Sequence, residues 1–120
     1  MMFIRGLNDC PEILAGDSTR LRELLHPDKA PLDLRYSLAH AVVKPGDTSL
    51  RHRLSVSEVY YILEGEGLMR IGEETARVGT GQAVYIPPHA VQCITNTGTA
   101  DLKFLCIVDP AWRPEEEEVF

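Results

Sequence analysis

The chain has 120 residues, a length that fits one folded domain with a single hydrophobic core. Its formal net charge of −6 and pI of about 5.1 argue against a nucleic-acid binder, which usually needs a basic face, and against an anionic membrane surface as partner. No apolar run is long enough to span a bilayer, and the odd count of three cysteines, without a Cys-x-x-Cys pair, favours a reducing cytoplasm.

The N-terminal residues are predicted to form a short strand followed by a short helix. Met1 to Leu7 alternates loosely in hydrophobicity and is strand-like. Leucines recur at helical spacing in residues 20–25, with Asp17 or Ser18 placed as an N-cap and Pro27 as the stop. The helix would be too short to form the core of the fold.

From Leu34 onward the pattern is that of short strands separated by turns. Period two predicts a strand up to Val42, with Leu38 and His40 on its inner face. Glycine, proline and asparagine then mark turns between further strand-like runs, at residues 45–47, 72–74, 79–81, 87–88 and 96–98. Many short strands at close, regular spacing predict an all-β sandwich or barrel.

These elements predict one domain over residues 1–120, with no repeat, linker or second domain. The barrel core would span about 34–109, and the N-terminal strand and helix, within 1–30, would lie outside it. The tail, 110–120, holds four consecutive acids, Glu115 to Glu118, and is expected to be solvated. Trp112 is expected to cover an edge or an end of the barrel.

A polar cluster is predicted inside the barrel. Alternation along two turn-bounded strands gives an inward-facing set, namely Glu58, Tyr60 and Ile62 on one strand and Gln92 and Ile94 on another. His52 lies an even number of residues before Glu58, so both side chains can point to the same side. One imidazole nitrogen and two oxygens, from His52, Glu58 and Gln92, suit a divalent ion such as Zn, Fe, Mn or Ni.

Each of these residues also has a structural explanation. His52 and Glu58 could form a buried hydrogen bond, and Gln92 could be a satisfied structural amide. His40 fits a core histidine, although its predicted inward face makes it the first substitute ligand. Tyr60 could offer its hydroxyl to a ligand, but an aromatic side chain on a barrel face is more often core.

The spacing resembles the two motifs of the cupin superfamily. The residues that match are Gly46, His52, Glu58 and Gly65 in the first motif, and Gly81, Pro87 and Asn96 in the second. Leu54 stands where the family has its second histidine, Gln92 where it has its third, and His89 replaces a turn glycine. The resemblance implies a double-stranded β-helix, or jelly-roll barrel, and frequent dimers. It also implies a metal site that here lacks one ligand.

Three functions remain open. The first is a metal-dependent enzyme of the oxygenase, isomerase, epimerase or lyase type, with open coordination positions for substrate. The second, favoured by Leu54 and Gln92, is a module that binds a small polar metabolite without chemistry. The third is a structural or regulatory dimer with a vestigial pocket. The pocket-lining candidates are His40, Leu54, Tyr60 and Ile94. We also expect a homodimer that pairs Met2 to Leu7 across its interface, because this segment has no obvious partner strand nearby.

Overall fold

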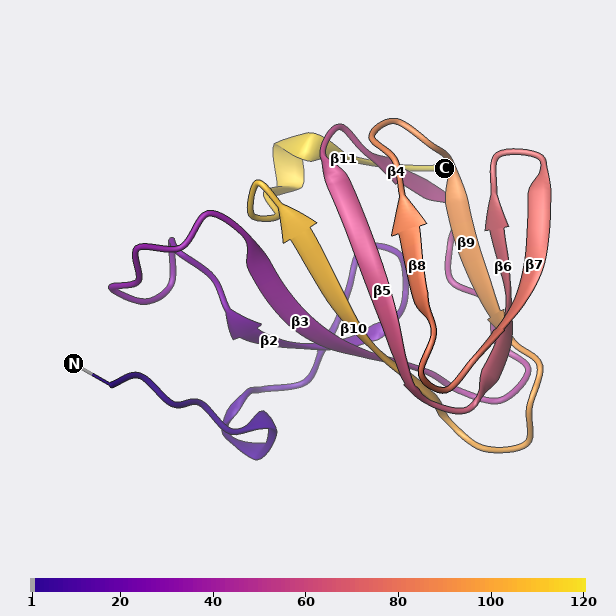
Figure 1. The fold of residues 1–120 in the computed structure, drawn as a ribbon, viewed down its shortest axis with the longest axis horizontal. Coiled ribbons are helices and arrows are strands. Elements are labelled where there is room, and N and C mark those ends of the chain that lie inside the picture. Colours follow the sequence, from indigo (N-terminus) through magenta and orange to yellow (C-terminus); the bar gives the residue numbers. More distant parts are fainter. Residues whose placement is uncertain (1) are drawn as a thin grey trace.

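The computed structural model describes residues 2–120 and is nearly all β (Figure 1). Within that range, eleven strands form two antiparallel sheets, ordered β1-β2-β3-β10-β5-β8 in the larger and β11-β4-β9-β6-β7 in the smaller. The strands are β1 (Ile13–Leu14), β2 (Arg20–Leu25), β3 (Ser37–Val43), β4 (His52–Leu54), β5 (Ser57–Glu64), β6 (Glu66–Ile71), β7 (Glu74–Gly79), β8 (Ala83–Ile86), β9 (Gln92–Asn96), β10 (Leu102–Asp109) and β11 (Glu117–Val119). Two 3-10 turns, η1 (Leu7–Asp9) and η2 (Pro114–Glu116), are the only helical elements of residues 2–120, and neither could cross a membrane.

The predicted N-terminal helix is wrong, because residues 20–25 form strand β2. This strand pairs antiparallel with β3, and the two-residue strand β1 forms the edge beyond it. Asp17 does not cap a helix: its Oδ1 accepts hydrogen bonds from the backbone N–H and the hydroxyl of Thr19, at 3.1 and 2.7 Å. The spacing of leucines predicts a helix only weakly. Hydrogen bonding to the long neighbouring strand β3 decides the structure of this segment instead.

The inner face of β3 is also opposite to the predicted one. The residues buried in the core are Ala39, Ala41 and Val43, whereas Leu38 and Val42 lie on the outer face. Ala41 pairs with Phe104 on β10, and the Phe104 ring packs against Tyr60 with centroids 4.4 Å apart. A small side chain on this face therefore leaves room for a large one on the next strand.

The faces predicted for β5 and β9 are confirmed. Glu58, Tyr60 and Ile62 are 6%, 2% and 0% exposed, whereas Tyr61 between them is 41% exposed. On β9, the buried residues are likewise Gln92, Ile94 and Asn96. The apolar members of both sets join the core that fills the space between the sheets.

Two turn positions account for parts of the motif pattern. Gly65 has φ of +90°, and a Cβ there would lie 2.9 Å from the Asp101 carbonyl oxygen, so a side chain would collide with the backbone. His89 has φ of 70°, in the left-handed region that glycine otherwise favours.

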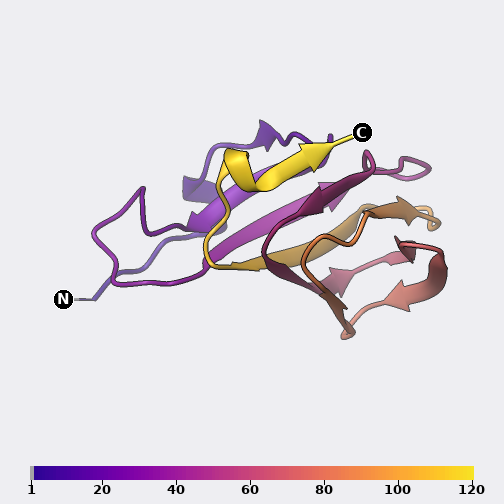
Figure 2. The same cartoon turned by 90° about the horizontal axis from the view of Figure 1, so that it is seen from above.

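The acidic tail is not solvated throughout, contrary to the prediction. Strand β11 pairs with β4, which places Glu117 opposite Leu54, and Figure 2 shows this C-terminal segment (yellow) running alongside β4. Alternation along a strand turns neighbouring side chains to opposite faces, so Glu117 is half-buried while Glu118 is exposed. Two contacts hold the preceding segment: His26 Nε2 lies 2.7 Å from the Trp112 carbonyl oxygen, and Arg113 pairs with Asp28 at 3.1 Å.

Candidate functional site

A cavity of about 260 Å³ opens into the interior. Its walls come from the 13–19 turn, from strands β2, β3, β4, β5 and β10, and from the C-terminal segment. Part of the wall is apolar, including Leu21, Leu54, Phe104, Val108 and Trp112. Ligand pockets commonly enclose roughly 300–1,000 Å³, so this cavity suits a small molecule.

The structure brings some of the predicted site residues together and separates others. Those on the cavity wall are His52, Leu54, Glu58 and Tyr60. Gln92 lies directly behind the wall, where its Nε2 donates a hydrogen bond of 2.8 Å to Glu58 Oε1. Ile94 is fully buried in the core. His40 pairs with Leu105 and Arg22 on the outer face of the larger sheet, so it is not placed to substitute as a ligand inside.

Glu58 is a carboxyl group that stays largely protonated at neutral pH. Burial raises its pKa to about 8, the hydrogen bond from Gln92 opposes this, and the charges of Asp17 and Glu117 raise it further. A protonated Glu58 has a hydroxyl to donate. Gln92 Oε1 is buried and accepts no hydrogen bond in the described chain, so the Glu58 hydroxyl is not committed to it.

His52 is buried, and both of its ring nitrogens face oxygen atoms. Nδ1 lies 3.0 Å from the Leu50 carbonyl oxygen, and Nε2 lies 3.6 Å from Asp17 Oδ2. The carbonyl oxygen can only accept, so it takes a hydrogen bond from Nδ1–H, whereas the Nε2–Oδ2 separation is too long for one. His52 Nε2 and the Asp17 carboxyl group are therefore both open to a group in the cavity.

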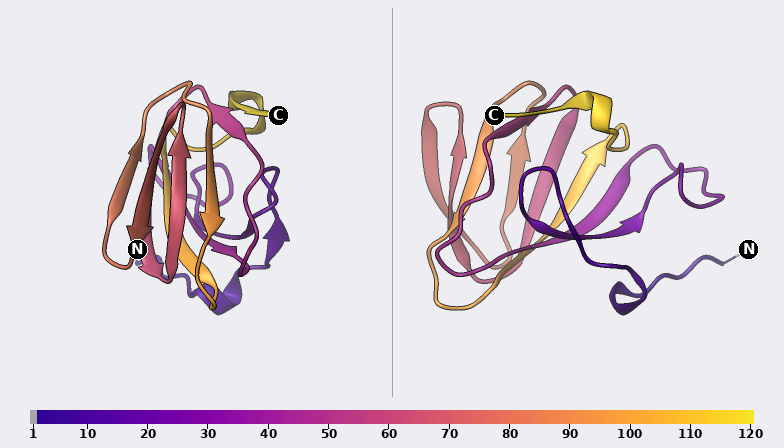
Figure 3. Two further views of the ribbon diagram at one scale, coloured as in Figure 1. Left: turned by 90° about the vertical axis from the view of Figure 1, so that its right-hand side faces the viewer. Right: turned by 180° about the vertical axis from the view of Figure 1, so that it is seen from behind.

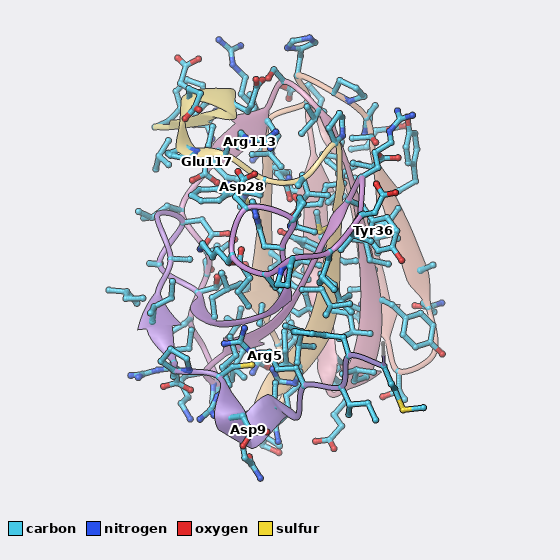
Figure 4. The ribbon with its side chains drawn as sticks, turned by 90° about the vertical axis from the view of Figure 1, so that its left-hand side faces the viewer. Arg5, Asp9, Asp28, Tyr36, Arg113 and Glu117 are labelled. Carbon is cyan, nitrogen blue, oxygen red and sulfur yellow. The ribbon has the colours of Figure 1, made fainter. Side chains whose placement is uncertain are left out.

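Glu117 brings another carboxyl group to the same wall, at the end of the molecule where Figure 4 labels it near Asp28 and Arg113. Burial raises its pKa, the charge of His52 lowers it, and the charge of Asp17 raises it again. The 2.9 Å distance between Glu117 Oε1 and a Cβ built on Gly16 shows how closely the carboxyl approaches the 13–19 turn. Asp17 and Glu117 thus share one side of the cavity.

The sequence analysis did not identify Asp17, Glu117 or Trp112 as cavity residues. One signal for Asp17 was available, since Gly-Asp-Ser-Thr is typical of a turn in which the carboxylate binds a backbone N–H two residues on. No local pattern identifies the other two, because the pairing of β11 with β4 across more than half the chain brings them there.

These donors do not fit the metal set that the resemblance implies. Leu54 supplies no ligand, and Gln92 turns its amide nitrogen toward Glu58. Glu58, whose pKa is raised to about 8, must also lose its proton before it can bind a metal at neutral pH. Across residues 2–120, no group of three or more His, Cys, Asp or Glu is arranged to hold an ion.

Comparison with known proteins gives a consistent picture. A family model described as a cupin domain matches residues 39–108, more than half of the chain. An uncharacterised protein of Methanocaldococcus jannaschii is 41% identical over 107 residues, which cover 88% of this chain and 85% of that protein.

Solved structures agree in fold. A polyketide cyclase from Streptomyces resistomycificus has a TM-score of 0.79 at 24% identity, covering 95% of this chain and 82% of its own. A Streptomyces nucleoside dehydratase has a TM-score of 0.79 at 14% identity, covering 100% of this chain and 92% of its own. At these identities the likeness shows a shared barrel, and proteins with that barrel include enzymes.

Proposed function

The chain belongs to the cupin family, and we propose that its cavity binds a small organic molecule and transfers protons on it through Glu58 and the His52–Asp17 pair. One observation carries the proposal: Glu58 is a buried carboxyl on the cavity wall, held by Gln92, with its pKa raised to about 8. A catalytic acid is most effective when its pKa lies near the working pH.

Glu58 acts as the acid in this proposal. Its protonated oxygen faces the cavity and donates to a departing hydroxyl or to a carbonyl oxygen of the substrate. Gln92 is the positioning residue, because its 2.8 Å hydrogen bond fixes the carboxyl plane. The name of one structural neighbour, a nucleoside dehydratase, accords with such a role, since loss of water requires a proton for the leaving hydroxyl.

The His52–Asp17 pair is the proton acceptor. The Nε2–Oδ2 distance of 3.6 Å is within ion-pair range but too long for a hydrogen bond, so a substrate group can approach either atom. The Leu50 carbonyl, 3.0 Å from Nδ1, fixes the ring. An acid and a base on one small cavity suit isomerisation, dehydration or cyclisation.

The apolar wall determines which molecules enter. Leu54, Phe104 and Trp112 exclude water and favour a ligand with an apolar frame. Hydrogen-bonding groups on the ligand would meet Glu58 and His52. Leu54 also favours a second candidate function, a module that binds such a molecule without chemistry, because it replaces a polar ligand position with an apolar surface.

The substitution Glu58→Gln tests the acid role. It preserves the shape of the side chain and its contact with Gln92 but removes the proton. We expect turnover of any substrate found in a screen to fall at least about 100-fold. Binding, followed as a ligand-dependent rise in melting temperature, should persist. Glu118→Gln, which makes the same change at an exposed carboxyl group outside the cavity, is the matched control. Unchanged turnover in E58Q would reject Glu58 as the acid, whereas binding without turnover in the wild type would leave the non-catalytic module as the function.

We also propose that the protein is a homodimer. The outer face of the larger sheet carries adjacent apolar side chains from four strands, namely Leu38, Val59, Tyr61, Tyr85, Leu105 and Ile107. The N-terminal arm adds Met2 and Ile4, which are 83% and 82% exposed, and Figure 3 shows this arm extending away from the strands. A second copy would cover both surfaces. A monomeric mass by light scattering at micromolar concentration would contradict this.

The compartment that we infer is the reducing cytoplasm. Cys10, Cys93 and Cys106 are all free thiols, and two of them are buried. Free buried cysteines are typical of proteins kept in a reducing environment.

A further inference from the structure

We infer that the molecule bound in this cavity is a small amine, positively charged at neutral pH and carried on an apolar or aromatic frame. The inference rests on the proposed function, because it names the ligand class of the same site. The first support is the excess of acidic side chains on the cavity wall. Four carboxyl groups line the cavity, from Asp17, Glu23, Glu58 and Glu117, against one lysine, Lys29, and one histidine, His52.

The lysine does not offset this excess. Lys29 Nζ lies 2.6 Å from Glu23 Oε1, so the two charges compensate each other at the cavity wall. Of the other three carboxyl groups, Glu58 is largely protonated, which leaves Asp17 and Glu117 beside a single imidazole. Asp17 and Glu117 would repel an anionic ligand. A neutral ligand would leave the negative charges of these two carboxyl groups uncompensated. A cation would compensate them.

The remaining acids lie close enough to act on one another. Glu117 Oε1 approaches the backbone of Gly16, next to Asp17, and Asp17 Oδ2 lies 3.6 Å from His52 Nε2. The negative charge of Asp17 contributes to the raised pKa of both Glu58 and Glu117, after burial. Protonation of Glu58 and Glu117 therefore removes negative charge that a bound cation would otherwise compensate.

The titratable and charged groups come from most of the elements around the cavity, whereas β1 and β3 contribute none. They are Asp17 in the 13–19 turn, Glu23 on β2, Lys29 in the following loop, His52 on β4, Glu58 and Tyr60 on β5, Cys106 on β10, and Glu117 on β11. Burial raises the pKa values of Tyr60 and Cys106 well above their ordinary range, so both stay neutral. Neither adds charge to the cavity wall.

Aromatic rings supply the second, independent support. Tyr60, Phe104 and Trp112 line the same cavity. An ammonium group is attracted to the face of an aromatic ring, most strongly to that of tryptophan. Acids and aromatic rings on one cavity wall match the charged group and the apolar frame of an arylalkyl or cycloalkyl amine.

Matched ligands test the inference by calorimetry at neutral pH. Benzylamine and cyclohexylamine are compared with benzyl alcohol and cyclohexanol, and with benzoate. We expect the amines to bind about tenfold or more tighter than the alcohols. Amine binding should release protons, seen as a heat that depends on the ionisation enthalpy of the buffer, because Glu58 or Glu117 ionises beside the cation.

Two neighbouring glutamates give a matched pair of variants. Glu117→Gln should weaken amine binding about tenfold and leave alcohol binding unchanged. Glu118→Gln should change neither, since Glu118 points to the other face and pairs with Arg53 at 2.7 Å. Alcohols or benzoate binding as tightly as the amines would overturn the cation inference while the proposed binding function stands. Failure of all five compounds to bind would overturn both.

Discussion

The same strands build two chemically different halves of the barrel interior. Along β5, Ile62 lies in the dry core, whereas Glu58, on the same face, lines the cavity. Along β9, Ile94 is core and Gln92 supports the site. Side-chain alternation decides only that these residues point inward. The position of a residue along its strand decides whether its side chain packs against other strands or lies at the cavity.

The largest expected effect is a loss of stability when the apolar half of the interior is disrupted. Ile62→Ala should lower the free energy of unfolding by about 2–5 kcal/mol, because it leaves a cavity in packed surroundings. Ile62 is fully buried. Tyr61→Ala, on the outer face of the same strand, is the control and should cost clearly less if the protein is studied as a monomer. Urea unfolding measures both, and equal losses would mean that the two faces of β5 are not distinct.

Alternation made the inward sets of β5 and β9 predictable from the sequence. Both strands lie between clear turns, and both alternate large apolar or polar residues with exposed ones. The same rule failed on β3, because its inner face carries Ala39 and Ala41, which are too small to stand out from their neighbours. It failed on β2 because leucines at residues 21, 24 and 25 fit a helix as well as a half-buried strand.

The site was only half predictable for a different reason. His52, Glu58 and Gln92 belong to motifs with characteristic spacing, so a polar cluster could be expected. Asp17 and Glu117 come from segments flanking the barrel, and only long-range pairing brings them to His52. Charge runs such as Glu115 to Glu118 usually lie in solvent, and nothing local to that run marks one member as buried.

The second prediction concerns the polar half of the interior and states how the stability of the protein should depend on pH through Glu58. The folded pKa of Glu58, about 8, lies above the ordinary 4.5, so the folded state binds a proton that the unfolded state releases between these values. Stability from this group is therefore complete below pH 4.5 and falls as pH rises, by on the order of 3 kcal/mol by pH 7. Glu58→Gln should abolish this fall. The variant should match the wild type near pH 4.5 and exceed it at pH 7 and above.

Urea titrations at several pH values give the measurement. Glu118→Gln is a suitable control, since that exposed carboxyl should leave the pH profile of the wild type unchanged. Parallel curves for E58Q and the wild type would mean that Glu58 is ionised in the folded protein at neutral pH. Its assignment as the acid would then fail.

The smallest expected effect concerns a metal ion and the identity of Leu54. The wild type should take up little Zn, Mn, Fe or Ni, because Gln92 presents its amide nitrogen to Glu58 and Leu54 supplies no ligand. Leu54→His would place a second imidazole on the cavity wall beside His52 and Glu58, which together offer three ligands. Metal added at ten times its dissociation constant should then stabilise the variant by about 1.4 kcal/mol, and more at higher pH, because Glu58 must ionise to bind.

Elemental analysis and melting curves, with and without metal, distinguish the two proteins. Stoichiometric metal in the wild type, lost in His52→Ala, would show instead that the polar half rearranges around an ion. The metal-dependent enzyme would then replace the proton-transfer site proposed above.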